Sequence, residues 1–339
     1  MSTATGSFSI VMPTHRRPDS LLQVLAALSR QDFPADRFEV IVVFDGEGPA
    51  TAASLDGHGY PFRLQVLHQD HAGPAAARNR AVAAAAEPYL LFLDDDVIPA
   101  PTLIRRHAEA HAGRSDRVVI GPLLAAGSSG APWTRWEWAT LARQYRAMAE
   151  GEWQPTPRQF YTGNASVLRE HVVAAGGFNP EFRRGEDVEL AWRLKALGLE
   201  FVFEPRAEAA HLARRSFQAW LQAAFEYGRT DVLLERKRTG DDLPGWVRRE
   251  FAERHRYTRR LAEVALTQSR LWQGIPTTGL ALASVASGLG LTRVANQTCS
   301  ALFTAAYWRG VAAQLGSVEA ALRLMKPPPP AVSPAELAP

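Results

Sequence analysis

Three consecutive carboxylates follow a short apolar run in the first third of the chain. Asp94, Asp95 and Asp96 come directly after residues 89–93. Adjacent like charges repel one another, so three of them at a strand end are costly unless a cation is bound there. As alternate residues, Asp94 and Asp96 can face one cleft and hold a divalent cation that also carries phosphate oxygens. A solvated acidic loop is the alternative explanation.

A second acidic pair, Glu186 and Asp187, stands where a helix over residues 188–197 is expected to begin. A carboxylate held at a cleft is a candidate general base. Ordinary capping of a helix by acidic first-turn residues is the alternative. His211 follows an apolar segment and is a further candidate ligand, although a lone histidine is more often structural.

Small residues open an alanine-rich helix over residues 74–86, which begins after Gly73 and carries Arg78 and Asn79 in its first turns. A glycine at a helix start lets a phosphate or nucleotide approach the backbone. The chain has neither a Walker A sequence nor G-x-G-x-x-G, which argues against an ATPase or a dinucleotide-dependent dehydrogenase.

Strands and helices must position these candidate side chains, and the apolar pattern predicts where those elements lie. Apolar runs alternate with helical patterns of 10–15 residues, which predicts crossover connections and a mainly parallel sheet flanked by helices. In such a sheet, ligands bind beyond the carboxyl ends of the strands. The expected strands are residues 8–12, 38–44, 63–68, 89–93, 118–120, 160–168 and 201–203.

The composition fits a folded chain with more than one part. The 339 residues are 46% hydrophobic and 22% charged, which excludes a disordered chain. The single cysteine, Cys299, excludes an internal disulfide and fits a reducing compartment, so we expect a cytoplasmic protein. We expect an α/β domain over residues 1–212, a helical region over 213–326 and a flexible Pro/Ala-rich tail over 327–339.

The helical region raises the question of membrane contact. Residues 271–292 carry no charge, but their proline and glycines favour an interfacial or core helix over a membrane span. Residues 206–260 hold 13 Lys/Arg against 8 Asp/Glu. This excess is explained either by a solvated helix surface or by peripheral contact with the cytoplasmic face of an anionic membrane. No motif supports nucleic-acid binding.

The order of the motifs resembles that of the family-2 inverting glycosyltransferases with the GT-A fold, over about residues 8–212. The matching segments are SIVMPTHRR from Ser9, VIVVFDG from Val40, GPAAARN from Gly73, LDDD from Leu93, TGNA from Thr162, GGF from Gly176 and GEDVEL from Gly185.

The resemblance implies a role for each matched residue. Asp187 is the implied catalytic base, with Glu186 positioning the acceptor or the base. Asp96 and His211 are the implied ligands of Mg²⁺ or Mn²⁺. The residues implied to contact the sugar-nucleotide donor are Pro13, Thr14, Asp45, Arg78, Asp94 and Asp95, with Asp45 accepting from the base and Asp94 on the ribose side. Tyr161 and Asn164 are the acceptor-side candidates.

The implied activity is transfer of one sugar from a nucleoside-diphosphate sugar to a glycan, lipid-linked or small-molecule acceptor, as in cell-envelope or polysaccharide synthesis. UDP is the expected nucleotide, with GDP and dTDP open. Two departures stand out: Phe44 replaces the first of a paired Asp-Asp, and the Q-x-x-R-W motif of processive members is missing. The alternatives are an inactive sugar-nucleotide-binding scaffold and a sugar-1-phosphate nucleotidyltransferase.

Overall fold

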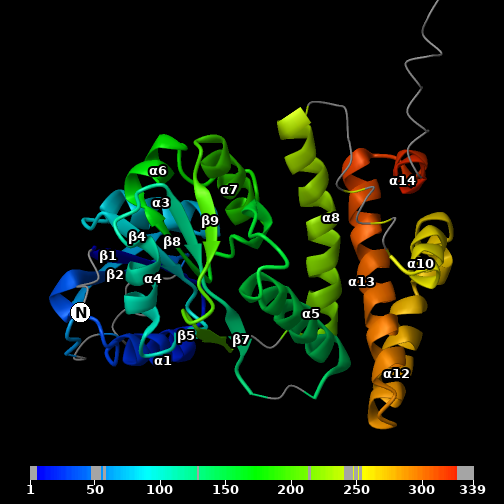
Figure 1. Cartoon of the computed structure of the whole chain (residues 1–339). Helices are drawn as coiled ribbons and strands as arrows, with labels where there is room; N and C mark the ends of the chain where they lie inside the picture. The colour runs from blue at the N-terminus through cyan, green and yellow to red at the C-terminus, as the bar shows by residue number, and fades with distance from the viewer. Residues whose placement is uncertain are drawn as a thin grey trace, which may run out of the picture. The chain divides into compact units, whose positions relative to one another are not determined.

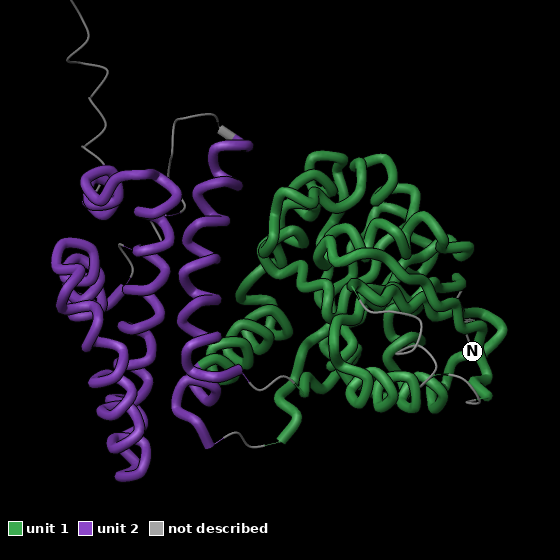
Figure 2. The backbone as a smooth tube through the Cα atoms, turned by 180° about the vertical axis from the view of Figure 1, so that it is seen from behind, with its two compact units in different colours: residues 1–129, 137–214 green, residues 130–136, 215–339 purple. Residues whose placement is uncertain are grey.

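The computed structural model describes residues 6–46, 55, 59–127, 130–212, 215–239, 247, 251 and 254–326. The chain divides into two compact units (Figure 2). Unit 1 comprises residues 1–129 and 137–214, and unit 2 comprises residues 130–136 and 215–339. The expected tail over residues 327–339 lies outside the described residues.

Unit 1 is built on a seven-stranded sheet with the order β3-β2-β1-β4-β8-β6-β9. Only β8 runs antiparallel to its neighbours, β4 and β6, so the sheet is mainly parallel, as expected. The strands are β1 (Phe8–Thr14), β2 (Phe38–Asp45), β3 (Arg63–Gln69), β4 (Tyr89–Leu93), β6 (Arg117–Ile120), β8 (Asn164–Leu168) and β9 (Glu200–Phe203).

Alternate side chains of each central strand enter two separate cores, one on each face of the sheet. On β1, Phe8, Ile10 and Met12 pack into one core, whereas Val11 packs into the other. The first core is covered by α1 (Pro18–Leu28) and α4 (Leu103–His111), and the second by α3 (Pro74–Ala84), α6 (Arg169–Ala174) and α7 (Glu186–Ala196) (Figure 1). Burial on both faces explains why β1, β2 and β4 are nearly continuous apolar runs.

The expected strand over residues 160–168 is shorter in the structure. A 3-10 turn over Pro157–Gln159 comes before this segment, and β8 starts only at Asn164. Thr156 caps that turn, because its side chain accepts from the backbone of Arg158 and Gln159 reaches back to the Thr156 amide. A turn at Thr162 and Gly163, closed by the Asn164 amide donating to the Tyr161 carbonyl oxygen at 3.1 Å, keeps residues 160–163 out of the strand.

A second, three-stranded sheet, which the sequence pattern does not predict, brings distant residues together. It consists of β5 (Val97–Pro99), β10 (Ala209–His211) and β7 (Leu123–Ala125). In the β5–β10 pair, His211 is the partner of Val97, the residue that follows Asp96. Each strand has only three residues, too few to show a period of two.

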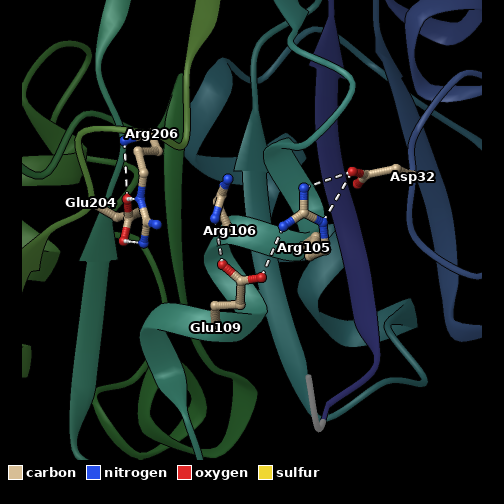
Figure 3. Close-up of polar contacts among 6 residues, drawn as sticks. All are labelled: Asp32, Arg105, Arg106, Glu109, Glu204 and Arg206. Carbon is tan, nitrogen blue, oxygen red and sulfur yellow. Dashed lines mark hydrogen bonds and ion pairs between the residues drawn. The ribbon is translucent and has the colours of Figure 1, made fainter. Parts of the chain in front are cut away.

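Charged side chains of α4 pair with one another and with Asp32, which lies in the segment after α1 (Figure 3). Arg105 contacts Asp32 at 2.8 Å and Glu109 at 2.9 Å, while Arg106 contacts the other oxygen of Glu109 at 2.8 Å. Near this group, Arg206 donates to Glu204 at 2.8 Å in the turn that leads into β10. Such partly exposed ion pairs contribute little each, ~0–1 kcal/mol. We assign them to the surface of the fold.

Unit 2 is helical. Its helices are α8 (Phe217–Thr239), α10 (Arg256–Thr267), α11 (Ser269–Trp272), α12 (Ile275–Gly288), α13 (Thr292–Leu315) and α14 (Val318–Met325), and α5 (Pro132–Ala149) begins in this unit. Glycines allow α8 and α13 to touch: a Cβ on Gly228 would lie 2.0 Å from the Tyr307 carbonyl oxygen, and one on Gly310 would lie 1.9 Å from that of Phe225. Among the described residues, no helix combines the length and apolar composition needed to cross a bilayer.

Candidate active site

The three carboxylates that follow β4 point to three different partners. Asp94 accepts a hydrogen bond from Arg78 at 2.8 Å. Asp95 turns inward and accepts from the hydroxyl of Thr14 at 2.7 Å. Asp96 lies 3.4 Å from Nε2 of His211. The tripeptide is therefore the centre of a polar cluster and differs from a solvated acidic loop.

Arg17 is a cationic partner that sequence reasoning missed. Its guanidinium donates to Asp95 at 3.2 Å and also to Asp96. The preceding residue, Arg16, has a φ of 56°, an uncommon left-handed conformation for a residue with a side chain. This turn follows the end of β1 and leads the chain to Arg17. The signal that could have indicated Arg17 is its type and position: it is a basic residue just after the buried strand β1, which ends beside the Asp-rich loop.

The surroundings shift the pKa values of Asp95 and Asp96 in opposite directions. Burial raises the pKa of Asp95 to about 6, although the Thr14 hydrogen bond and Arg17 oppose this shift. Burial also acts on Asp96, but His211 and Arg17 together hold the pKa of Asp96 below its ordinary value. Asp96 is thus kept as an anion, the form in which a carboxylate binds a cation.

Asp96 and His211 fit a divalent cation by their chemistry. A carboxylate oxygen from the residue before β5 and an imidazole nitrogen from the last residue of β10 converge, and Arg17 supplies the positive charge that the buried acids require. Carboxylate suits Mg²⁺ and Mn²⁺, whereas imidazole also suits transition metals. Trp138 packs its ring against His211 with the centroids 5.8 Å apart, so it restricts the orientation of the imidazole.

Arg78 connects the Asp-rich loop with the second acidic pair. Its guanidinium is buried, donating to Asp94 at 2.8 Å and to Oε1 of Glu186 at 2.7 Å. The Arg78 Nε atom is buried without a hydrogen-bond partner in the described structure. The ring of Phe178 lies 5.7 Å from the guanidinium carbon. Segments that are 108 positions apart in sequence are therefore held at one site.

Asp187 occupies the first turn of α7, next to Glu186. Gly185 begins this helix with a φ of 75°, a left-handed conformation that glycine adopts without strain. Asp187 keeps a small part of its surface exposed but is mostly covered, and the nearby Glu186 and Glu189 are buried. Burial, followed by the charge of Glu186, raises the pKa of Asp187 to about 7. A carboxylate with such a pKa can accept a proton near neutral pH.

A second polar cluster surrounds Asp45 at the end of β2. Its carboxylate accepts from the backbone amides of Ala72 and Gly73 at 2.7 and 2.9 Å and from Gln69 at 2.8 Å. Burial opposes ionisation, but these hydrogen bonds keep the pKa of Asp45 below its ordinary value. Asp45 therefore anchors the loop that leads into α3.

Two histidines that sequence reasoning did not single out flank Asp45. Nδ1 of His71 lies 3.0 Å from the Asp45 carboxylate, and Nδ1 of His15 donates to the Asp45 carbonyl oxygen at 2.6 Å. The two rings are 4.6 Å apart and inclined by 32°. Among the described residues, these three form the group of donors close enough to hold a metal ion together. Most of the Asp45 lone pairs already have donors, which makes this cluster a poorer cation site than Asp96 with His211.

The remaining expected residues take different places. Pro13 is partly exposed on β1 and Tyr161 is partly exposed before β8, whereas Thr14 is buried. Asn164 is fully buried, and its amide nitrogen donates to the carbonyl oxygens of Pro122 and Ala207. Its oxygen faces Nε2 of His107 at 2.9 Å. With every polar atom engaged, Asn164 has none left for an acceptor.

The fold and the cluster define a class of protein: a GT-A domain with acidic residues at the carboxyl ends of its strands. Residues 9–175 match the family model described as Glycosyl transferase family 2. This part of the chain is a family-2 glycosyltransferase domain.

Sequence relatives and solved structures agree with this identification. The chain is 28% identical over 223 residues to the pre-mycofactocin glycosyltransferase of Mycobacterium tuberculosis, covering 65% of this chain and 46% of the relative. It is 28% identical over 221 residues to the validoxylamine A glucosyltransferase of Streptomyces hygroscopicus, covering 56% of this chain and 52% of the relative. The chain thus spans about half the length of these relatives.

The solved structures extend the likeness of fold over most of the chain. The mannosyltransferase PcManGT of Pyrobaculum calidifontis, in complex with GDP-Man and Mn²⁺, has a TM-score of 0.60 at 19% identity, covering 90% of this chain and 87% of the other. Residues 1–349 of Staphylococcus aureus TarS, in complex with UDP-GlcNAc, have a TM-score of 0.52 at 16% identity, covering 92% of each chain. At these identities the likeness establishes the fold.

Proposed function

We propose that this chain transfers a single sugar from a nucleoside-diphosphate sugar to a hydroxyl group of an acceptor, with inversion at the anomeric carbon. The observation that carries the proposal is the buried Arg78 guanidinium, which binds Asp94 and Glu186 at once. It keeps the donor-side carboxylates beside Asp187, so a proton acceptor and a cation site face one reaction centre.

Asp187 acts as the general base in this proposal. As the acceptor oxygen attacks the anomeric carbon, the hydroxyl proton passes to the Asp187 carboxylate, and the bond from the anomeric carbon to the diphosphate oxygen breaks on the opposite face. The pKa of about 7 suits this role, because much of Asp187 is ionised at neutral pH while it keeps substantial basicity. Glu186 and Arg78 fix the start of α7, from which Asp187 projects.

Asp96 and His211 would hold the divalent cation, with Asp94 on the sugar-nucleotide side. A bound Mg²⁺ or Mn²⁺ offsets the charge that develops on the diphosphate leaving group. Arg17 supplies positive charge to the same carboxylates, and its contact with Asp96 would give way when the cation binds. The complex of PcManGT with GDP-Man and Mn²⁺ supports this assignment by analogy of fold.

Asp45 and the two histidines would form the nucleoside pocket. A nucleobase N–H would take the Asp45 lone pair that now faces Nδ1 of His71, while the His15 ring offers a stacking surface. Uridine is our first choice of nucleoside, and GDP and dTDP sugars are the alternatives. The relatives named for pre-mycofactocin and validoxylamine A support a small-molecule acceptor beside a glycan or lipid-linked one. We place the reaction in the cytoplasm, because the one cysteine fits a reducing compartment.

A panel of UDP-, GDP- and dTDP-sugars, each with and without Mn²⁺ or Mg²⁺, tests the proposal by thermal shift and by release of nucleoside diphosphate. We expect one nucleotide to stabilise the protein only when the cation is present. Asp96→Ala should abolish that shift, whereas Asp116→Ala, an exposed carboxylate elsewhere in unit 1, should retain it. Equal stabilisation by every nucleotide without a cation would refute the metal assignment.

A further inference from the structure

Helix α12 has its small residues inside and its large apolar residues outside. Gly279, Ala283 and Ala286 face α13, where a Cβ on Gly279 would come within 2.9 Å of Leu302. On the outer face, Leu282, Val285 and Leu289 keep 53%, 60% and 70% of their surface exposed. A helix that only packs on its own core places its large apolar residues inward. The outer face of α12 therefore has a use outside the core of unit 2.

Further exposed apolar residues flank α12 along the chain. Leu271 before the helix and Leu291 after it are also exposed, as is Val294 at the start of α13. An apolar groove of about 450 Å³ opens beside them between α10, α12 and α13, and Leu261, Leu282, Val294 and Leu302 are among its lining residues. We call Leu271, Leu282, Val285, Leu289 and Leu291 the α12 surface.

The stretch of chain that contains the α12 surface carries charge of one sign. Between Glu263 and Glu319 the sequence contains no acidic residue and three arginines. Arg270 and Arg293 are exposed at the two ends of this surface. Arg309 instead packs over Trp272 and donates to the carbonyl oxygen of Ala265. An exposed apolar helix with a cation at each end is complementary to a bilayer that carries anionic headgroups.

We propose that the α12 surface docks unit 2 on an anionic phospholipid bilayer, with α12 lying in the interface. Leu282, Val285 and Leu289 enter the acyl boundary, and Arg270 and Arg293 contact the lipid phosphates. The uncharged α12 is 14 residues long, which is too short to span about 30 Å of hydrocarbon but suits an interfacial helix. This inference rests on the surface of unit 2 and is independent of the proposed chemistry in unit 1.

Co-sedimentation of the full chain with phosphatidylcholine vesicles, with and without phosphatidylglycerol, tests the docking. The variant Leu282→Asn/Val285→Asn/Leu289→Asn should bind anionic vesicles at least about tenfold more weakly than the wild type. The matched control is Val173→Asn/Leu197→Asn, which removes two exposed apolar side chains from unit 1 and should bind as the wild type does. Because the altered positions are exposed, thermal melts should show that both variants remain folded.

Arg270→Gln/Arg293→Gln should lower binding to anionic vesicles on the order of tenfold and leave the weak binding to phosphatidylcholine unchanged. Vesicle binding that the triple variant leaves intact would overturn the proposal. So would light scattering without vesicles that shows a wild-type dimer and a monomeric triple variant, because a second copy of the chain would then cover the surface. A lack of sugar-nucleotide binding would affect only the proposed function.

Discussion

Arg78 on α3 donates a hydrogen bond of 2.7 Å to Glu186 at the start of α7. Both side chains are almost fully buried, with 5% and 9% of their surface exposed. Neither charge is tolerable there alone, because burial of an ion without a partner costs several kcal/mol. The bond therefore couples the integrity of the site to the packing of two helices on the same face of the sheet.

Loss of this guanidinium should destabilise unit 1. Arg78→Met leaves Glu186 buried without its cation, so we expect the free energy of unfolding to fall by about 3–5 kcal/mol. Urea denaturation followed by circular dichroism measures the change. Arg80→Met, on the exposed side of the same helix, is the control and should change stability by less than about 0.5 kcal/mol. Equal stability of the two variants would contradict the coupling.

Removal of the proposed base should slow transfer without loss of donor binding. We expect Asp187→Asn to lower kcat by roughly 10²–10⁴-fold, because the amide cannot take the acceptor proton. The KM for the sugar-nucleotide should stay within a factor of about three, since Asp187 acts on the acceptor. Initial rates at varied donor concentration separate the two effects. A variant with unchanged kcat would exclude Asp187 as the base.

The pH dependence of transfer should report the raised pKa of Asp187. Burial and Glu186 disfavour its charged form, so kcat/KM should fall about tenfold per pH unit below pH about 7 as the base becomes protonated. Glu186→Gln removes the neighbouring negative charge and should move this limb to lower pH. An acid limb that stays in place in Glu186→Gln would show that another group is titrating.

Arg17 and a divalent cation should compete for the same carboxylates. Arg17→Met leaves Asp95 and Asp96 without that guanidinium, so we expect Mn²⁺ affinity in the absence of nucleotide to rise on the order of tenfold. Isothermal titration calorimetry measures it directly. Arg16→Met is the neighbouring control and should leave the affinity unchanged. Weaker Mn²⁺ binding by Arg17→Met would place Arg17 among the groups that support the cation.

Two buried histidines should make the fold sensitive to acid. Burial lowers the pKa of His107 to about 4 and that of His111 to about 3. Both lie below the unfolded value of about 6.5, so below that pH the unfolded chain binds more protons and stability falls as pH falls. Each histidine contributes a slope of up to about 1.4 kcal/mol per pH unit between pH about 6.5 and 4.

The hydrogen bonds of this pair allow the contribution of one histidine to be isolated. Nε2 of His111 lies 2.8 Å from the Ser166 hydroxyl, while its Nδ1 is buried without a partner. The His111 ring also packs against Tyr89. His111→Phe should preserve this packing. It should also lower by about one the number of protons that the chain takes up on unfolding, and so reduce the pH dependence of the free energy of unfolding. Urea titrations at pH 7 and pH 5 give the difference, and an unchanged slope would rule out His111 as a source of acid sensitivity.

Much of unit 1 could be predicted because its signals are local. The buried strands β1, β2 and β4 are recognisable in the sequence as apolar runs, and the acidic residues lie directly at strand and helix ends. The orientation of each acid could not be predicted. Asp95 faces Thr14 and Asp94 faces Arg78 because of how strands and helices pack, which leaves no periodic trace in the sequence.

By itself, the amino-acid sequence determined the α/β class, the family likeness and the identity of the acidic residues, since apolar periodicity and motif order are properties of contiguous segments. Only the tertiary structure decided which of those residues meet. His211 reaches Asp96 through a three-residue pairing of β10 with β5, and Arg17 reaches both inner aspartates through one left-handed residue. Contacts across some 80 to 115 positions depend on chain closure and packing, which no local pattern encodes.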